Sequence, residues 1–205
     1  ELLEGKSLHQ IFHEEAPLEW KRVFKILTEM CSSLAEAHAQ GIVHRDLKPE
    51  NIYLETRPGN PEFVKILDFG IAKVESASVT RAGMMVGTPY YMSPEHIRGG
   101  VLDGRTDVFA VGVILHELFA GKRPFMADDS TRILYRIVNE PHPQLPEGAA
   151  GPLTADVQRV IDKALEKEAD ARYASAGLMA DELTRLREQY PTPQLPAEEV
   201  AALSQ

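Results

Sequence analysis

The sequence has 205 residues, of which 43% are hydrophobic and 26% are charged, as is ordinary for a soluble globular domain with a core of its own. Its formal net charge of −9 argues against a general binder of nucleic acids or anionic membranes, because both partners attract a basic surface. A single cysteine excludes an internal disulfide, and no apolar run approaches the ~18 residues of a membrane span.

The first 41 residues are predicted to form a short extended segment and two helices. The extended segment ends at Gly5, and residues 8–12 then have an apolar spacing typical of a helix. Pro17 suits the first turn of a long helix, whose apolar residues keep to one face. Gly41 ends this helix.

Two short β-rich runs follow, at residues 52–54 and 64–67. The segment between them, 55–62, is dense in turn residues, so we expect a small hairpin with a long loop. Residues 71–93 show no apolar period and predict a long loop. Ordered loops of this length are usually functional.

The second half of the chain is predicted to be helical. Its expected helices cover residues 94–98, 106–120, 129–139, 154–167 and 174–189. The helix at 106–120 is apolar nearly all round, so we expect it at the centre of the core. Residues 191–205 are rich in proline, alanine and glutamate, which is typical of a linker.

The chemistry of the chain is concentrated in the sequence His44-Arg45-Asp46-Leu47-Lys48-Pro49-Glu50-Asn51. It places a carboxylate, an ammonium and an amide within six positions. Phosphoryl transfer uses such a set, because a carboxylate orients a hydroxyl, a cation steadies the γ-phosphate and an amide oxygen helps to hold Mg²⁺. The octapeptide matches the pattern H-R-D-L-x-x-x-N.

Two further blocks follow in order. Asp68-Phe69-Gly70 comes directly after the predicted hairpin, which would bring the Asp68 carboxylate beside Asn51, where the two oxygens can share Mg²⁺. The third block is 87–95, in which Ser93-Pro94-Glu95 stands where the pattern has A-P-E.

Three ordered blocks with this spacing resemble the large catalytic lobe of the eukaryotic-type (Hanks-type) Ser/Thr protein kinases, and the residues around the loop are similar to those of bacterial members. The resemblance implies a mainly α fold. About seven helices would surround a central apolar helix, with a small β-hairpin beside them.

The resemblance implies a role for each matching polar residue. Asp46 would be the catalytic base, and Lys48 would contact the γ-phosphate of ATP. Asn51 and Asp68 would hold Mg²⁺, with Mn²⁺ as an alternative ion. Thr88 would bond back to Asp46 and Lys48, a feature of the Ser/Thr-specific kinases.

The ATP site is only half present in the sequence. Glu1 and Leu3 match the hinge segment that faces the adenine edge, and Tyr53 matches the position beneath the adenine ring. Lys48 and Asp68 complete the expected nucleotide contacts. Aliphatic residues are usual in the family at the position of Tyr53, so the aromatic ring is a departure.

The resemblance also implies control by phosphorylation. Arg45 would receive a phosphate from the loop at 71–93, with Thr80 as the first choice of acceptor, followed by Ser78 and Ser76. Such a phosphate would pair with the guanidinium in bidentate fashion and order the loop.

Two matches are structural. Asp107, at the start of the apolar helix, would cap the backbone near His44 and Arg45. Glu95 would form an ion pair with Arg172.

We expect residues 1–190 to be a partial kinase domain, the hinge and the large C-terminal lobe, followed by a linker or tail at 191–205. A glycine-rich loop and a lysine–glutamate pair, the phosphate-binding parts of a small N-terminal lobe, are missing, so this fragment alone should be close to inactive. The expected partners are ATP, protein substrates, a small lobe in a longer parent chain and a second copy for autophosphorylation in trans. Nucleic acid is not expected, and the expected location is cytoplasmic.

Two alternatives come from other classes of protein. One is a truncated, pseudokinase-like scaffold that binds partners without catalysis, against which the intact Asp46, Lys48, Asn51 and Asp68 argue. The other is a small-molecule phosphotransferase of the same superfamily. Those enzymes lack the block at 87–95 that docks a peptide, so its presence favours protein substrates.

Overall fold

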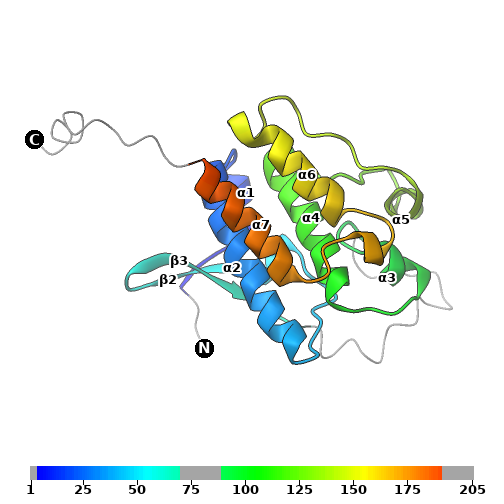
Figure 1. Cartoon of the computed structure of the whole chain (residues 1–205), viewed down its shortest axis with the longest axis horizontal. Helices are drawn as coiled ribbons and strands as arrows, with labels where there is room; N and C mark the ends of the chain where they lie inside the picture. The colour runs from blue at the N-terminus through cyan, green and yellow to red at the C-terminus, as the bar shows by residue number, and fades with distance from the viewer. Residues whose placement is uncertain (1–3, 70–88, 191–205) are drawn as a thin grey trace, which may run out of the picture.

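Seven α-helices and a three-stranded antiparallel sheet make up the part of the chain that the computed structural model describes, residues 4–69 and 89–190 (Figure 1). In chain order the elements are β1 (Gly5–Ser7), α1 (Leu8–Glu15), α2 (Trp20–Ala39), β2 (Ile52–Arg57), β3 (Asn60–Ile66), α3 (Pro94–Arg98), α4 (Gly104–Ala120), α5 (Ser130–Asn139), α6 (Thr154–Ala164) and α7 (Ala176–Gln189). Short 3-10 turns cover Pro49–Asn51, Gly151–Leu153 and Ala169–Ala171. The mainly helical fold expected from the sequence is confirmed.

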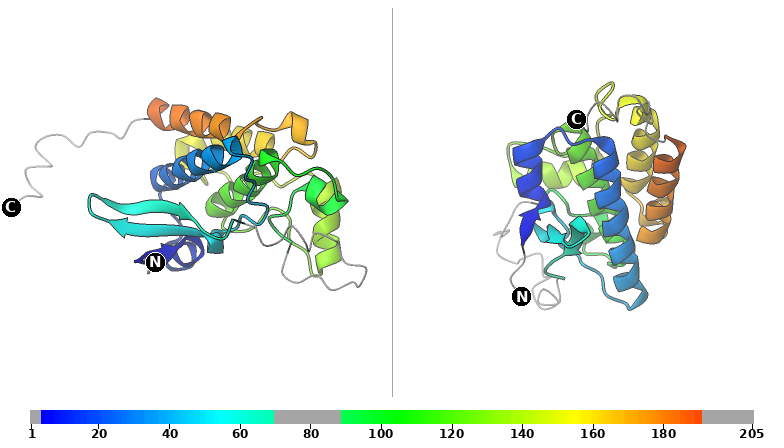
Figure 2. Two further views of the ribbon diagram at one scale, coloured as in Figure 1. Left: turned by 90° about the horizontal axis from the view of Figure 1, so that it is seen from below. Right: turned by 90° about the vertical axis from the view of Figure 1, so that its left-hand side faces the viewer.

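Helix α4 lies at the centre of the core. Thirteen of its 17 residues are buried, on all sides of the helix, as its apolar sequence predicts. Helices α2 and α7 run side by side and both contact α4, while α6 packs on α4 as well (Figures 1 and 2). At Gly112 an added Cβ would lie 2.8 Å from the Cβ of Ala164, so glycine permits the close approach of α6.

Helix α2 leads from the core to the loop at residues 44–51, which contains the predicted catalytic residues. Its apolar residues, from Val23 to Leu34, are buried, and the helix ends before Gly41, whose φ of 76° turns the chain. The predicted end at this glycine is thus confirmed to within two residues. No helix within residues 4–69 and 89–190 is both long enough and apolar enough to cross a membrane.

The sheet has the order β1-β2-β3 and lies along α2, with its hairpin at the end of the molecule opposite α3 and α5 (Figures 1 and 2). Leu54 pairs with Val64 and Ile52 with Ile66, and all four side chains are buried. Alternation along the two strands therefore puts one face of the sheet on the core.

The long hairpin loop predicted for residues 55–62 is wrong, because both strands continue through it and only Pro58 and Gly59 form the turn. Pro61 contributed to this prediction because proline is common in turns. In the structure it lies within β3, where it is tolerated because β3 is an edge strand. Side chains also extend the pairing: the guanidinium carbon of Arg57 lies 3.5 Å from the ring centroid of Phe63 across the strands.

The third strand, β1, was not predicted as part of a sheet. It pairs antiparallel with β2, with Gly5 opposite Glu55. An added Cβ at Gly5 would lie 2.0 Å from the carbonyl oxygen of Leu54, so only glycine fits this crossing.

Helix α6 ends at Ala164, three residues before the predicted end. After it, the chain turns so that the Nζ of Lys167 donates to the carbonyl of Ile137 in the last turn of α5, at 2.8 Å. The carbonyls of Glu166 and Lys167 are then available to accept from Arg172. A continued helix would use these carbonyls internally, so the early end has a structural reason.

Candidate functional site

The loop at residues 44–51 is tied to the core helix by the carboxylate of Asp107. Its Oδ2 accepts from the backbone N–H of His44 and its Oδ1 from that of Arg45, both at 2.9 Å. The Nε2 of His38, in the last turn of α2, lies 2.7 Å from the same Oδ2. Asp107 is 1% exposed, so these three partners offset the desolvation of a buried charge.

His44 joins the loop to the segment that carries Asp68. Its ring is fully buried, with Nε2 2.9 Å from the carbonyl of Leu67 and Nδ1 accepting from the backbone N–H of Asp46 at 3.3 Å. A carbonyl only accepts and an amide N–H only donates, so the ring is the neutral Nε2–H tautomer. The Phe69 ring packs against it, at 5.0 Å between centroids.

Asn51 makes a second link between the same segments. Its backbone carbonyl accepts from the N–H of Leu67 at 2.8 Å, and its side-chain N–H donates to the carbonyl of Asp46 at 2.9 Å. This bond directs the amide oxygen of Asn51 away from that carbonyl. Asp68 follows Leu67 with a φ of 54°, a left-handed conformation that turns the chain sharply.

The side chains of Asp46 and Lys48 lie on the outside of this framework. The Nζ of Lys48 is 3.7 Å from Oδ2 of Asp46, and both side chains are about one third exposed. Asn51, by contrast, is 8% exposed. The arrangement leaves a carboxylate and an ammonium accessible to solvent while the backbone beneath them is held by buried hydrogen bonds.

Arg45 has an unusual backbone conformation and a buried polar atom without a partner among the described residues. Arg45 has a φ of 66°, and its Nε is buried without a hydrogen-bond acceptor among the described residues. A buried guanidinium N–H without an acceptor costs free energy, so an anionic partner there would be favourable.

Glu95 and Arg172 form a buried ion pair. The two terminal nitrogens of Arg172 each donate to one carboxylate oxygen of Glu95, at 2.8 Å. Three backbone carbonyls, of Arg105, Glu166 and Lys167, accept the remaining N–H groups, so all five guanidinium donors are used.

The pKa of Glu95 falls from 4.5 to about 2. Burial alone would raise this pKa, but the hydrogen bonds from Arg172 and its charge outweigh burial. Ser93, which replaces the alanine of the pattern, is buried and accepts from the backbone N–H of His96 at 3.3 Å, so it caps α3.

Tyr53 lies in β2 on the side of the sheet opposite Ile52 and Leu54, and its hydroxyl donates to the carbonyl of Gly5 at 2.7 Å. Six of the predicted site residues lie outside the described residues. They are Glu1, Leu3, Ser76, Ser78, Thr80 and Thr88.

Sequence reasoning missed a cluster beside the loop. The hydroxyl of Tyr91 donates to Oε2 of Glu117 at 2.6 Å, and Nε of Arg123 donates to Oε1 of the same carboxylate at 3.1 Å. The available signal was Glu117 itself, an acidic residue in the last turn of a helix that is mostly apolar. His38 was missed as well, because nothing in the sequence indicates its contact with Asp107.

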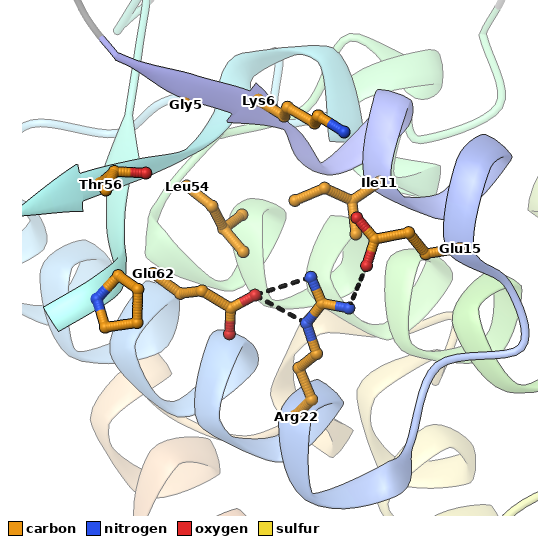
Figure 3. A pocket seen from close by; sticks show the side chains of 9 residues that line it. Gly5, Lys6, Ile11, Glu15, Arg22, Leu54, Thr56 and Glu62 are labelled. Carbon is orange, nitrogen blue, oxygen red and sulfur yellow. Dashed lines mark hydrogen bonds and ion pairs between the residues drawn. The ribbon is translucent and has the colours of Figure 1, made fainter.

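A hollow of about 250 Å³ opens elsewhere, between β1, α1, α2 and the hairpin (Figure 3). Arg22 crosses it and pairs with Glu15 at 2.5 Å and with Glu62 at 2.7 Å, near the side chains of Ile11 and Leu54. It contains none of the predicted site residues.

The described residues contain no group of three or more histidine, cysteine, aspartate or glutamate side chains placed to bind a metal ion. Asn51 and Asp68 supply only one amide and one carboxylate. This set suits Mg²⁺, which proteins often bind through one or two side-chain oxygens with substrate phosphates and water as further ligands.

Residues 1–184 match the family model described as the protein kinase domain. Serine/threonine-protein kinase pkn3 of Myxococcus xanthus is 43% identical over 189 residues, which cover 89% of this chain and 35% of that protein. Serine/threonine-protein kinase Pkn1 of the same organism is 45% identical over 162 residues, 78% of this chain and 23% of the relative. Serine/threonine-protein kinase PknB of Mycobacterium tuberculosis is 36% identical over 194 residues, 93% of this chain and 30% of the relative.

The chain thus spans about a quarter to a third of the length of the curated relatives it matches. The match with the family model covers most of the chain and includes the loop, the Asp68 segment and the Glu95–Arg172 pair. The chain belongs to the protein kinase family.

Proposed function

We propose that this chain is the large lobe of a Ser/Thr protein kinase, which transfers the γ-phosphoryl group of ATP to serine or threonine hydroxyls of proteins. The observation that carries the proposal is the set of buried bonds from Asp107, His44 and Asn51 that holds the loop to the Asp68 segment. Phosphoryl transfer depends mainly on positioning and electrostatic stabilisation, and such a framework supplies the positioning.

Within this proposal each side chain has a distinct role. Asp46 orients the substrate hydroxyl and accepts its proton, and Lys48, 3.7 Å away, neutralises charge on the transferred phosphoryl group. Thr88 would hydrogen-bond to both Asp46 and Lys48. Asn51 and Asp68 hold Mg²⁺, whose chemistry when bound is to neutralise phosphate oxygens.

The ATP site continues beyond these residues. Glu1 and Leu3 bind the adenine edge, and the Tyr53 ring lies beneath the purine. We propose that a small N-terminal lobe in a longer parent chain provides the rest, so that residues 1–190 are the hinge and large lobe and 191–205 a linker. Proteins are the substrates, and two copies of the kinase phosphorylate each other in trans.

Arg45 is proposed to bind a phosphate on Thr80, Ser78 or Ser76. Its buried Nε, which has no acceptor among the described residues, supports this role. The phosphate would then link the loop at 71–93 to the catalytic loop through a charge-assisted hydrogen bond.

The test is a transfer assay with the chain joined to its small lobe. We expect transfer of the γ-phosphoryl group from ATP to a protein, recovery of phosphoserine or phosphothreonine on hydrolysis, and loss of transfer when Mg²⁺ is chelated. Phosphorylation of small-molecule alcohols alone would favour a small-molecule phosphotransferase. Nucleotide or partner binding without any transfer would instead identify a scaffold, and either result would contradict the proposal.

A further inference from the structure

Two histidines of α1 lie one helical turn apart on a side of the helix that the core does not use. Leu8 and Ile11 are buried, which fixes the rotation of α1 about its axis. His9 and His13, at positions i and i+4, share an outer face, where their rings contact each other at 4.4 Å between centroids. Two imidazoles at this spacing are the ligand pair with which a single helix binds Zn²⁺.

The start of α1 is firmly anchored. The side-chain oxygen of Ser7 accepts from the backbone N–H of Gln10 at 3.2 Å, and the side chain of Gln10 accepts from the backbone N–H of Ser7 at 2.9 Å. Ser7 also pairs with Tyr53 in the sheet. This reciprocal capping holds the first turn of the helix, so the two histidines stand on a fixed backbone and little chain entropy would be lost on binding an ion.

The carboxylate of Glu50 faces the first of these rings. Its Oε1 lies 3.8 Å from the Nδ1 of His9, and α1 packs on the turn Pro49–Asn51 that contains Glu50. This distance is too long for a hydrogen bond, but both side chains are nearly half exposed and can close it by a small rotation. A histidine that binds a metal ion usually donates its other ring N–H to a carboxylate, which fixes the tautomer and makes the ligating nitrogen more basic. With Nδ1 toward Glu50, Nε2 of His9 is the nitrogen that can bind the ion.

The available ligands select the kind of ion. Glu50 is an outer partner and not a ligand, which agrees with the lack of a group of three or more potential ligands among residues 4–69 and 89–190. The two carboxylates of α1, Glu14 and Glu15, pair with Lys6 and Arg22, both at 2.5 Å. Nitrogen ligands suit Zn²⁺, whereas Mg²⁺ and Ca²⁺ prefer oxygen.

A second pair of histidines offers a comparison within the same chain. The rings of His116 and His142 are 6.4 Å apart between centroids. His116 is fully buried, and its Nδ1 lies 3.1 Å from the carbonyl of Lys122. Both nitrogens of His142 face acceptors, the Pro143 carbonyl at 3.1 Å and the Asp162 carboxylate at 3.3 Å. Burial and these contacts leave the second pair less suited to an ion than the exposed pair on α1.

We propose that His9 and His13 bind one Zn²⁺ ion, with water molecules as the remaining ligands and the Glu50 carboxylate accepting from the Nδ1–H of His9. This site is separate from the Mg²⁺ site proposed at Asn51 and Asp68. Because Glu50 directly precedes Asn51, an ion held in this way would act on the loop at residues 44–51 through the carboxylate. The inference goes beyond the proposed function and does not depend on it, because binding of the ion requires neither ATP nor phosphoryl transfer.

The test titrates this chain, free of any polyhistidine tag, with Zn²⁺ in a calorimeter and follows its seven histidine rings by NMR. Excess Mg²⁺ is present to occupy oxygen sites. We expect one Zn²⁺ per chain, with changes in the ring signals of His9 and His13 and in the backbone amides of Glu50 and Asn51. Changes centred on the other histidines, or no binding below about 1 mM Zn²⁺, would overturn the proposal.

Four variants locate the ion. His9→Ala and His13→Ala should each weaken Zn²⁺ binding by about tenfold or more, because a single imidazole cannot chelate the ion. Glu50→Ala should weaken it by about tenfold, the lower end of the usual effect of an outer partner. His142→Ala is the matched control and should bind as wild type does. Unchanged affinity in either α1 variant, or weaker binding by His142→Ala, overturns the site, and unchanged affinity in Glu50→Ala overturns its link to the loop.

Thermal melting gives an independent readout and checks folding. Alanine favours a helix, so both α1 variants should fold without the ion. An ion that binds only the folded chain raises its melting temperature. Zn²⁺ should therefore raise the melting temperature of wild type and of His142→Ala, but not that of His9→Ala or His13→Ala. An equal rise in all of these proteins would contradict the assignment to α1.

Discussion

Replacing Arg172 with alanine is expected to lower the melting temperature of this chain by roughly 10 °C. Arg172 is fully buried in its side chain and uses all five N–H donors, two of them on Glu95. Removing one partner of a buried ion pair typically costs about 3–5 kcal/mol, because the remaining charge stays buried without its partner. In a protein of this size each kcal/mol shifts the midpoint by about 2–4 °C. Thermal unfolding followed by circular dichroism measures the change.

Arg187→Ala is the matched control. Arg187 is exposed on α7, and substitutions at such positions usually change stability by less than about 0.5 kcal/mol. Equal melting temperatures for the two variants would contradict a stabilising role of the Glu95–Arg172 pair.

The same pair predicts a pH dependence. The pKa of Glu95 is about 2 in the folded protein, below its ordinary value of 4.5, so the folded state favours the ionised carboxylate. Its contribution is fully present above about pH 4.5 and is lost as the pH falls toward 2. The difference in unfolding free energy between wild type and Arg172→Ala should therefore shrink over this interval in denaturant titrations. A constant difference from pH 5 to pH 2.5 would contradict the prediction.

The loop at residues 44–51 could be identified from the sequence as the candidate catalytic loop because its polar residues are close together in the chain. Asp46, Lys48 and Asn51 lie within six positions, and their residue types match the chemistry. The central helix was predicted for a related reason, since only a buried helix is apolar on all sides. Features that depend on local composition could therefore be predicted from the sequence.

Contacts between distant segments of the chain could be predicted only from the family resemblance. Asp107 meets the backbone of His44 across 63 positions, and Arg172 meets Glu95 across 77. The contacts of His38 and Glu117 and the pairing of β1 were not predicted even with the resemblance. Their roles follow from packing, which brings the end of α2 onto α4 and the segment at Gly5 onto β2.

Two predictions from local composition were wrong because contacts with other parts of the chain outweighed the local preference. The density of turn residues at 55–62 indicated a long loop, but β2 and β3 pair with each other as far as Arg57 and Asn60, and Arg57 stacks on Phe63. At the end of α6 the apolar pattern continued to Leu165, whereas the carbonyls that follow accept from Arg172 and end the helix.

Replacing Asp46 with asparagine is expected to reduce kcat by about 10²- to 10⁴-fold, the usual contribution of a positioned base. Asparagine has nearly the same shape, and the backbone contacts of residue 46 with His44 and Asn51 remain possible to form. The loss should therefore be chemical and not structural. Because Asp46 does not belong to the proposed nucleotide contacts, KM for ATP should change little, so that kcat and kcat/KM fall together.

Asp128→Asn is the matched control, since Asp128 is an exposed carboxylate in the segment before α5, away from the loop. It should retain full activity.

The most direct measurement is the initial rate of phosphoryl transfer from ATP to a protein serine or threonine, determined in parallel for wild type, Asp46→Asn and Asp128→Asn, each joined to the small lobe. A fall of at least 100-fold in Asp46→Asn alone, with an unchanged melting temperature, is the predicted result. Transfer by Asp46→Asn at more than about a tenth of the wild-type rate would contradict the assignment of this loop as the catalytic centre.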